Sequence, residues 1–256
     1  RGLGRGGLAA MAASGDAGGD VSEFGEVLVR RGSVVVVNAT PDRFDELERV
    51  QAASYPTLAQ SDLILATHLR AQHAAFAEGQ HMAIDTETGR VVGMNCGLLT
   101  DSFDEAHPQH TFQGMTGGLM FTTHTPSGAW YYGADICVHP DCRGKGVGRM
   151  LYDARKAVAR RHNCKGITSG GLIPGYCRHM AGHPKCGPEP LTAREYVSKV
   201  VAGELNDPTL SFQLRCGFEV VGVIDSYLED TASGNYAAAI VWRNPDYSEA
   251  GAARER

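Results

Sequence analysis

Residues 138–148 read Val-His-Pro-Asp-Cys-Arg-Gly-Lys-Gly-Val-Gly, and this stretch decides the fold of the chain. Its three glycines lie within five residues, so the backbone can approach a ligand without interference from Cβ atoms. The run Trp130–Val138 reads as a strand, and Arg149–Arg161 reads as a helix. A helix that begins here presents unpaired N–H groups and the positive end of its dipole. We therefore predict an anion site, with Arg143 and Lys145 adding charge at its mouth.

This glycine pattern differs from the two common nucleotide-binding motifs. It lacks the Gly-x-Gly-x-x-Gly order of a dinucleotide-binding turn. It also differs from a P-loop, because glycine follows Lys145 where a P-loop has the serine or threonine whose hydroxyl binds magnesium. The strand before the loop also follows two hairpin strands, whereas those folds repeat strand and helix. From the residues alone, the remaining alternative is a strand–loop–helix junction whose glycines serve packing.

The segments around this motif predict an α/β fold with a mixed, mostly antiparallel central sheet flanked by helices. Apolar runs and turn signals place the other strands at Val34–Val37, His81–Asp85, Arg90–Leu99, Gly166–Gly170, Phe218–Tyr227 and Tyr236–Trp242. Helical spacing and caps place helices at residues 40–53, 58–79, 192–202 and 208–215.

Two long segments interrupt this regular order. Residues 100–128 are rich in Gly, Thr, His and Pro with little periodicity, and we expect a loop that acts as a lid on the substrate side. Residues 172–206 read as an insertion with its own helix, which Thr192 and Glu195 open as a capping box.

Inside the insertion, four metal-ligand types occur within ten residues, at Cys177, His179, His183 and Cys186. Four such side chains can close on zinc, but this spacing is not a standard one. We favour a substrate-facing loop without a metal.

Composition limits the classes of protein to which this chain can belong, and the two ends of the chain differ from its middle. A net charge of -5 opposes a general affinity for nucleic acid, and no run approaches the roughly 18 apolar residues of a membrane span. Seven scattered cysteines indicate reduced thiols, in the cytoplasm or an organelle. We expect residues 1–31 to be a disordered or targeting-like segment, residues 32–244 to be the folded domain and residues 245–256 to be a flexible tail.

The pattern Arg143-x-x-Gly146-x-Gly148, preceded by Val138 and Pro140, resembles the acetyl-coenzyme A motif of the GNAT superfamily of N-acyltransferases. The order of elements from about residue 34 to residue 242 is similar to that family, and Gly217-Phe218 resembles its helix-to-strand junction. Further stretches resemble GNAT domains that are often joined to a carbon-nitrogen hydrolase domain, although these 256 residues hold no such hydrolase: residues 132–135, 170–176 and 207–215.

The resemblance implies a V-shaped splay between the fourth and fifth predicted strands, with acetyl-CoA bound as co-substrate. Backbone amides of the glycine loop, residues 143–148, would hold the pyrophosphate: Arg143, Gly144, Lys145, Gly146, Val147 and Gly148. The strand edge at Ile136, Cys137 and Val138 would pair with pantetheine, and Asn206 would reach the coenzyme arm. A backbone N–H near Val138 would polarise the thioester carbonyl.

Acyl transfer to an amine needs a base, and an acid can protonate the leaving thiolate. Asp135, beside the expected thioester, is our base candidate, with a purely structural carboxylate as the alternative. Tyr132 and Tyr176 are the acid candidates, together with Tyr131. Many GNAT enzymes carry a tyrosine one turn before the Gly-Phe junction, but this chain has Gln213 there, so either another tyrosine serves or the thiolate leaves unassisted.

We therefore predict an enzyme, an N-acetyltransferase that transfers the acetyl group of acetyl-CoA directly to a primary amine. The acceptor is a small molecule or a peptide, with no nucleic acid, membrane or metal partner, and a homo-oligomer stays open. The alternative is a catalytically silent acyl-CoA-binding module that acts as a sensor or partner subunit.

Overall fold

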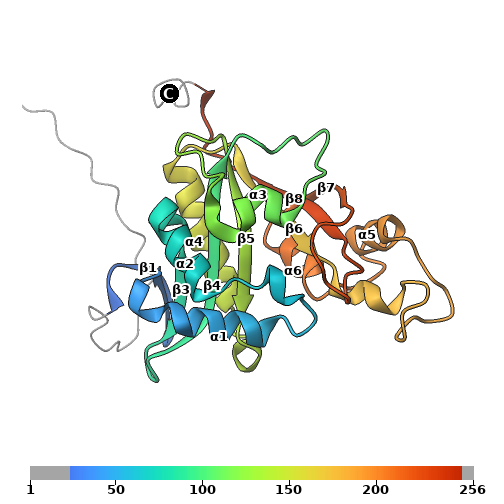
Figure 1. Cartoon of the computed structure of the whole chain (residues 1–256), viewed down its shortest axis with the longest axis horizontal. Helices are drawn as coiled ribbons and strands as arrows, with labels where there is room; N and C mark the ends of the chain where they lie inside the picture. Colours follow the sequence, from blue (N-terminus) through green and yellow to red (C-terminus); the bar gives the residue numbers. More distant parts are fainter. Residues whose placement is uncertain (1–23, 250–256) are drawn as a thin grey trace, which may run out of the picture.

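An eight-stranded sheet forms the centre of the computed structural model, which describes residues 24–249 (Figure 1). The strand order is β1-β2-β3-β4-β5-β6-β8-β7, and every neighbouring pair is antiparallel except β5 and β6. The strands are β1 (Val27–Arg31), β2 (Val34–Asn38), β3 (His81–Asp85), β4 (Arg90–Thr100), β5 (Trp130–Val138), β6 (Gly166–Leu172), β7 (Glu219–Ile224) and β8 (Ala237–Arg243). The predicted mixed, mostly antiparallel sheet is confirmed.

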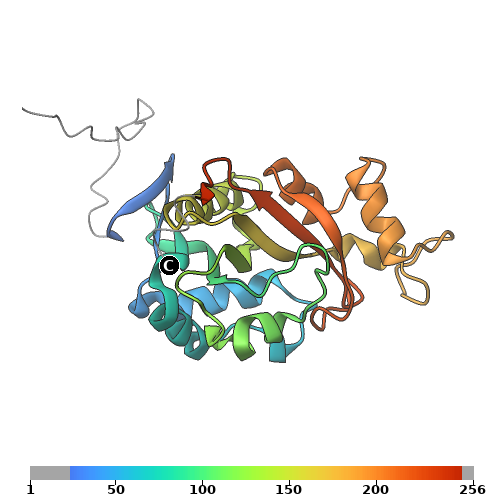
Figure 2. The same ribbon diagram turned by 90° about the horizontal axis from the view of Figure 1, so that it is seen from above.

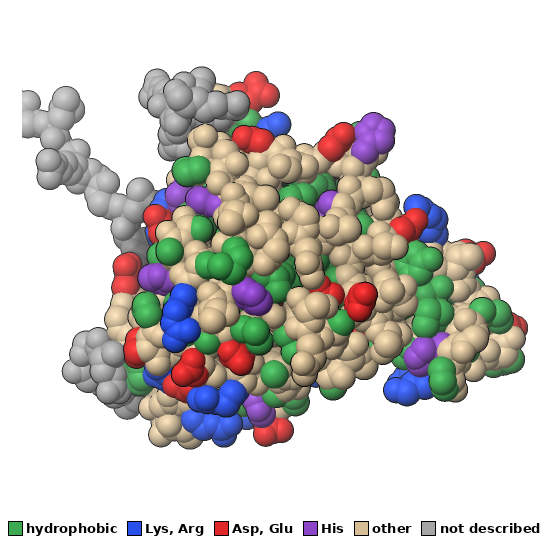
Figure 3. Space-filling view, viewed as in Figure 1, with side chains coloured by type: hydrophobic (Ala, Val, Ile, Leu, Met, Phe, Trp, Pro, Cys, Tyr) green, Lys and Arg blue, Asp and Glu red, His purple; other side chains and the backbone are tan. Residues whose placement is uncertain are grey.

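Helices cover both faces of this sheet (Figure 2). One face carries α1 (Phe44–Ser54) and α2 (Ala66–Phe76), and the other carries α4 (Val147–Arg161) and α6 (Leu210–Arg215). The remaining elements are α3 (Phe112–Thr116), α5 (Ala193–Val201), η2 (Pro41–Arg43), η3 (Gln60–Asp62), η4 (Ala77–Gly79), η5 (Gly117–Phe121), η6 (Pro140–Cys142) and η7 (Pro174–Arg178). On the face drawn in Figure 3, acidic and basic side chains are interspersed.

The predicted splay lies between β5 and β6, which are the fourth and fifth predicted strands because β1 was not predicted. These strands pair only from Trp130–Gly166 to Tyr132–Thr168. One residue further on, the Ser169 hydroxyl donates to the Gly133 carbonyl at 2.7 Å, and beyond it the strands have no further pairs. The register of β4 against β5 shifts at this point, and such a bulge bends a strand away from its neighbour. The carboxyl half of β5 therefore has an open edge.

Two segments differ from the sequence prediction. Residues 27–31 form the edge strand β1, although we predicted residues 1–31 to be a disordered or targeting-like segment. Residues 1–23 and 250–256 lie outside the described residues, and so do the targeting character expected of the first range and most of the tail expected at residues 245–256. The predicted loop 100–128 contains α3 and η5, whose Phe112 and Phe121 are buried. Its turns are too short for a periodic signal, and positive φ angles at Leu119 and Phe121 break them, so pattern reading could not find them.

The insertion projects from the end of the molecule opposite β1 (Figures 1 and 2). Its predicted helix is confirmed as α5, and Thr192 and Glu195 form the reciprocal capping box. The buried Asp207 carboxylate joins this segment to the body of the domain: Oδ1 accepts from two N–H groups at the start of α6, and Oδ2 accepts from Gly175 N and the Tyr196 hydroxyl. Within residues 24–249, no helix is long and apolar enough to cross a membrane.

Candidate functional site

The glycine loop connects η6 to the first turn of α4. Gly146, the N-cap of α4, has a φ of 84°, a left-handed conformation that glycine adopts without strain. No side chain caps this helix start, so its first N–H groups lack side-chain acceptors. Gly148 also allows close packing, because a Cβ there would lie 3.0 Å from Phe212 of α6. The loop therefore combines an uncapped helix start with close packing against α6, which suits an anion.

Arg143 has a structural task that the sequence did not predict. Its Nε donates to the Val138 carbonyl at 3.1 Å, and its Nη2 donates to the Ser54 carbonyl at the end of α1, also at 3.1 Å. We expected this guanidinium to add charge at the mouth of the loop. Two of its nitrogens also clamp the loop to α1 and to the end of β5.

The open edge of β5 presents the backbone of Val138. His139 N donates to Val92 O of β4 at 2.9 Å, and in a trans peptide the preceding carbonyl points the opposite way. The Val138 carbonyl, held by Arg143 and by the Ser54 hydroxyl at 3.2 Å, therefore lies on the open side. The N–H of a strand residue points to the same side as its carbonyl. The Val138 N–H is thus directed into the splay.

Asp135 is a buried carboxylate close to this edge. The Tyr55 hydroxyl donates to its Oδ1 at 2.6 Å and lies 2.9 Å from the Ile136 carbonyl oxygen, whereas Oδ2 is buried without a hydrogen-bond partner among the described residues. Burial raises the pKa of the Asp135 carboxyl, and the hydrogen bond from Tyr55 and the nearby charge of Arg155 act in the opposite direction. The Gln51 side chain also lowers this pKa, and Oδ2 is the oxygen left to take a proton.

Arg155 of α4 is a buried cation behind the same strand. It is 1% exposed, and its Nη2 donates to the carbonyls of Cys96 (3.0 Å) and Asp135. Its guanidinium lies 5.7 Å and 5.6 Å from the ring centres of Tyr131 and Tyr152. These contacts hold the β4–β5 bulge and place a positive charge near the Asp135 carboxyl.

Tyr132 lies in a polar cluster on the α1 side of the sheet. Its hydroxyl is 2.7 Å from the Tyr227 hydroxyl and 3.3 Å from His110 Nε2. Burial raises the pKa of Tyr132 and lowers that of His110, so both groups stay neutral near pH 7. The sequence treated His110 as an ordinary loop histidine, because its two partners lie 22 and 117 residues away.

Gln213 occupies the position where the resemblance led us to look for a tyrosine. It is 3% exposed, its Nε2 donates to the Tyr152 hydroxyl at 3.3 Å, and its Oε1 has no described partner. Burial raises the pKa of Tyr152 to about 12, so this phenol keeps its proton at neutral pH. Since Tyr152 accepts from Gln213, its own proton remains available. Sequence reasoning missed Tyr152, which has no motif to mark it.

The other predicted site residues lie in the insertion or beside it. The Tyr176 hydroxyl donates to Leu191 O at 3.0 Å, within the insertion, and has no described contact with Asp135. Asn206 lines a cavity of about 580 Å³ together with Arg178 and His179. The structure therefore brings Asp135, residues 136–138 and the glycine loop together at the end of β5, but it places Tyr176 apart from them.

The four metal-ligand types of the insertion also separate. Cys177 is buried, and the Cys186 thiol donates to the Gly187 carbonyl at 3.3 Å. His183 Nδ1 accepts from the Lys185 N–H at 3.1 Å. Within residues 24–249, no three His, Cys, Asp or Glu side chains are placed to share a metal ion.

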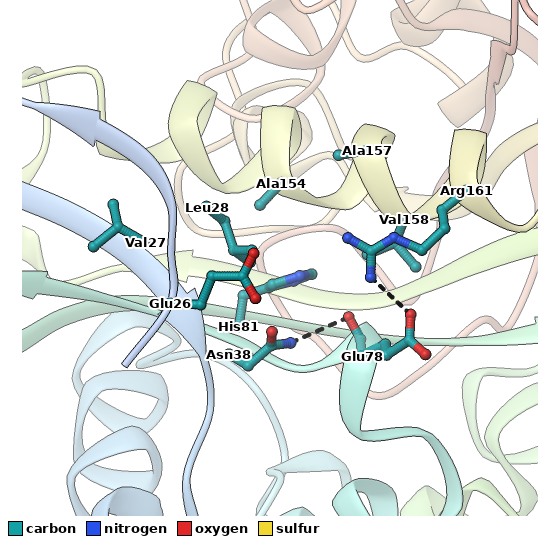
Figure 4. A pocket seen from close by; sticks show the side chains of 10 residues that line it. All are labelled: Glu26, Val27, Leu28, Asn38, Glu78, His81, Ala154, Ala157, Val158 and Arg161. Atoms are coloured by element: carbon teal, nitrogen blue, oxygen red, sulfur yellow. Dashed lines mark hydrogen bonds and ion pairs between the residues drawn. The ribbon is translucent and has the colours of Figure 1, made fainter. Parts of the chain in front are cut away.

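A smaller cavity of about 240 Å³ lies between β1 and α4, away from the splay (Figure 4). His81 lines it, with Nδ1 2.7 Å from Asn95 Oδ1. Because the Asn95 amide nitrogen donates to Leu151 O, its oxygen must accept from His81, which leaves His81 Nε2 unprotonated and without a described partner. Burial lowers the pKa of His81 to about 4.

Comparison with known proteins places this site in a family. The model of the acetyltransferase (GNAT) family matches residues 44–170. The uncharacterized N-acetyltransferase YkwB of Bacillus subtilis (strain 168) is 30% identical over 219 residues, which cover 85% of this chain and 92% of that protein. The probable hydrolase YhcX of the same organism is 41% identical over 181 residues, 70% of this chain, but the chain spans only about a third (33%) of YhcX.

A solved structure shares the fold. The GNAT-like decarboxylase GphF, in complex with isobutyryl-CoA, superposes with a TM-score of 0.67 at 21% identity. The match covers 82% of this chain and 98% of that one. At this identity, the likeness concerns the arrangement of the sheet and helices alone.

Proposed function

This chain belongs to the GNAT acetyltransferase family, and from that premise we propose that it transfers an acetyl group from acetyl-CoA to a primary amine. Its fold and family make it an acyl-CoA-dependent acyltransferase. One observation carries the amine-directed part of the proposal: the buried Asp135 carboxylate has a free oxygen beside the open edge of β5. A carboxylate with a raised pKa at that place suits the removal of a proton from an attacking amine.

For the coenzyme, we propose that the N–H groups of the glycine loop bind the pyrophosphate. The uncapped start of α4 supports this assignment, because nothing else satisfies those donors within the described side chains. The pantetheine arm then follows the edge formed by Ile136, Cys137 and Val138, and we propose that Asn206 reaches it from the insertion.

The reaction joins the amine nitrogen to the thioester carbonyl carbon and breaks the bond from that carbon to sulfur. Asp135 accepts the amine proton, directly or through one water molecule. The Val138 N–H donates to the carbonyl oxygen as negative charge develops there, and electrostatic stabilisation of that kind is usually the largest single contribution to acyl transfer.

We propose that the Tyr152 hydroxyl donates a hydrogen bond to the leaving thiolate. A thiol with a pKa of about 8.5 leaves readily, and a phenol that keeps its proton needs only to donate a hydrogen bond to it. Tyr132 and Tyr176, the candidates from sequence, have hydroxyls that already contact Tyr227 and the Leu191 carbonyl. We propose Tyr152 for this role because its proton has no described acceptor.

A second candidate, a silent acyl-CoA-binding module, is favoured by Gln213. An amide at this position cannot supply a proton, and a sensor or partner subunit needs coenzyme binding without turnover. Only the first candidate, the acetyltransferase, needs an acceptor, which would be a small amine or a peptide terminus.

Isothermal titration with acetyl-CoA, followed by an assay of CoA release with a panel of primary amines, separates the two candidates. We expect the unaltered chain to bind and turn over, Gly146→Val to lose binding, and Asp135→Asn to bind but turn over at least about 100-fold more slowly. Binding without turnover of any amine would support the silent module. If the unaltered chain failed to bind acetyl-CoA, both candidates would be wrong.

A further inference from the structure

The edge strand β1 carries an arginine to the glycine loop. The family match begins at residue 44, so β1 lies ahead of the region that the family model describes. Arg31, the last residue of β1, pairs with Val34 across a tight turn. A Cβ built on Gly146 would lie 2.7 Å from Arg31 Nη1 and 3.7 Å from Arg31 Cδ. The arginine therefore lies along the backbone of the loop, in space that any larger residue at position 146 would occupy.

Packing between β1 and α4 determines this position. Leu28 and Val29 of β1 pack against an apolar cluster that includes Val147 and Leu151 of α4. Figure 4 shows the same relationship further along the helix, where the Leu28 side chain lies beside Ala154. Because β1 is also hydrogen-bonded to β2 along its length, its end is held at the first turn of α4.

Charge at the loop makes this arginine more than a packing residue. The guanidinium of Arg143 already donates to two backbone carbonyls. By contrast, Arg31 is exposed and forms no ion pair with any carboxylate in the described part of the chain. Guanidinium groups bind phosphate oxygens through paired N–H donors, and the N–H groups of a helix start favour the same anion.

We infer that Arg31 binds the diphosphate of acyl-CoA, together with the backbone amides of the glycine loop. This inference rests on the proposed function, since it adds a residue to the same coenzyme site. Arg31 thus adds a cation from β1 to the charge that we predicted at the mouth of the loop from Arg143 and Lys145.

Arg30 offers a matched control. It is also exposed and lies on the same strand, but neighbouring side chains of a strand point to opposite faces. We expect Arg31→Ala to raise the Kd for CoA about tenfold, as for the loss of a charge-assisted hydrogen bond, and Arg30→Ala to change it less than about twofold. Equal thermal unfolding midpoints of the two variants would show that β1 stays in place.

Three ligands identify the group that Arg31 contacts. Arg31→Ala is expected to weaken CoA and 3′-dephospho-CoA equally, because both contain the diphosphate, and to leave acetyl-pantetheine, which has no phosphate, unaffected. A loss seen with CoA but not with 3′-dephospho-CoA would overturn the inference in favour of the 3′-phosphate. If Arg31→Ala and the unaltered chain bound CoA equally well, the inference about Arg31 would be wrong, but the proposed function would stand. If the unaltered chain did not bind CoA, both the inference and the proposed function would be wrong.

Discussion

At the scale of single residues, burial decides which groups keep or lose a proton. Asp135, Tyr152 and His81 all lie in the interior, where the charged form of a side chain loses its hydration. The direction of each pKa shift follows from this: upward for the carboxyl and the phenol, downward for the imidazole. Hydrogen bonds then adjust the result, as the Tyr55 hydroxyl does for Asp135.

The Tyr55→Phe variant tests the base directly. The Tyr55 hydrogen bond lowers the pKa of Asp135, so its removal should raise that pKa further. Since a base must be ionised, the acidic limb of kcat/KM against pH should move to higher pH in Tyr55→Phe and disappear in Asp135→Asn. An unchanged limb in Tyr55→Phe would assign the titrating group elsewhere.

His81 should make the protein sensitive to acid. Its folded pKa, about 4, lies below the ordinary histidine value of about 6.5, so the unfolded chain binds a proton first and stability falls as the pH drops from about 6.5 to about 4. This group should cost about 2 kcal/mol of the free energy of unfolding between pH 7 and pH 5.

Urea unfolding at these two pH values measures the effect of His81. In His81→Gln, which cannot titrate, the difference between pH 7 and pH 5 should shrink by that amount. An identical pH dependence in the variant and the unaltered chain would show that His81 does not remain neutral in the fold.

At the scale of elements, short-range hydrogen bonds set where helices begin. Thr192 and Glu195 satisfy each other's backbone N–H groups at the start of α5, with distances of 3.2 Å and 2.8 Å. The start of α4 has no such side chain, and the glycine loop ahead of it, with a left-handed Gly146, is what makes α4 the candidate for an anion.

Thr192→Ala should loosen α5 without affecting α4. Loss of an N-cap hydroxyl costs about 1 kcal/mol, which would speed amide hydrogen exchange across α5 roughly fivefold. Ser198→Ala, an exposed change in the same helix, should leave exchange unaltered. If both variants exchanged alike, the capping box would contribute nothing to the stability of the insertion.

At the scale of the whole molecule, the splay exists because the two halves of the sheet meet only at three residue pairs, Trp130–Gly166 to Tyr132–Thr168. One apolar cluster lies under α1 and α2 on one face, and others lie under α4 and α6 on the opposite face. The insertion is joined to this body through Asp207, which receives donors from α6, from η7 and from α5.

Asp207→Asn should therefore weaken the contacts that hold the insertion against the rest of the domain. An amide NH₂ group in place of Oδ2 would face the Gly175 N–H and the Tyr196 hydroxyl, two donors without an acceptor. We expect a loss of about 2–4 kcal/mol in the free energy of unfolding, measured with urea. Asn206→Ala, at the exposed neighbouring position, should change it by less than about 0.5 kcal/mol. Equal losses in the two variants would contradict this role for Asp207.

The sequence by itself determined the features that depend on near neighbours. Strand β5 has the predicted limits, Trp130–Val138, because its apolar run is long and ends at a proline-containing turn. The capping box of α5 is a pattern of three residues' reach. The glycine spacing of residues 144–148 led to the family, and the family led to the splay between the strands on either side of α4.

Only the tertiary structure decided which distant side chains meet. Tyr55 reaches Asp135 across 80 residues, and Arg31 reaches Gly146 across 115. A local pattern specifies whether a segment is a strand or a helix, and it specifies the buried face. It contains no information on the partner that packing brings to that face, because the partner depends on how the whole chain folds back. The glycine loop is visible in one stretch of sequence, whereas the contacts of Tyr55 with Asp135 and of Arg31 with Gly146 are visible in none.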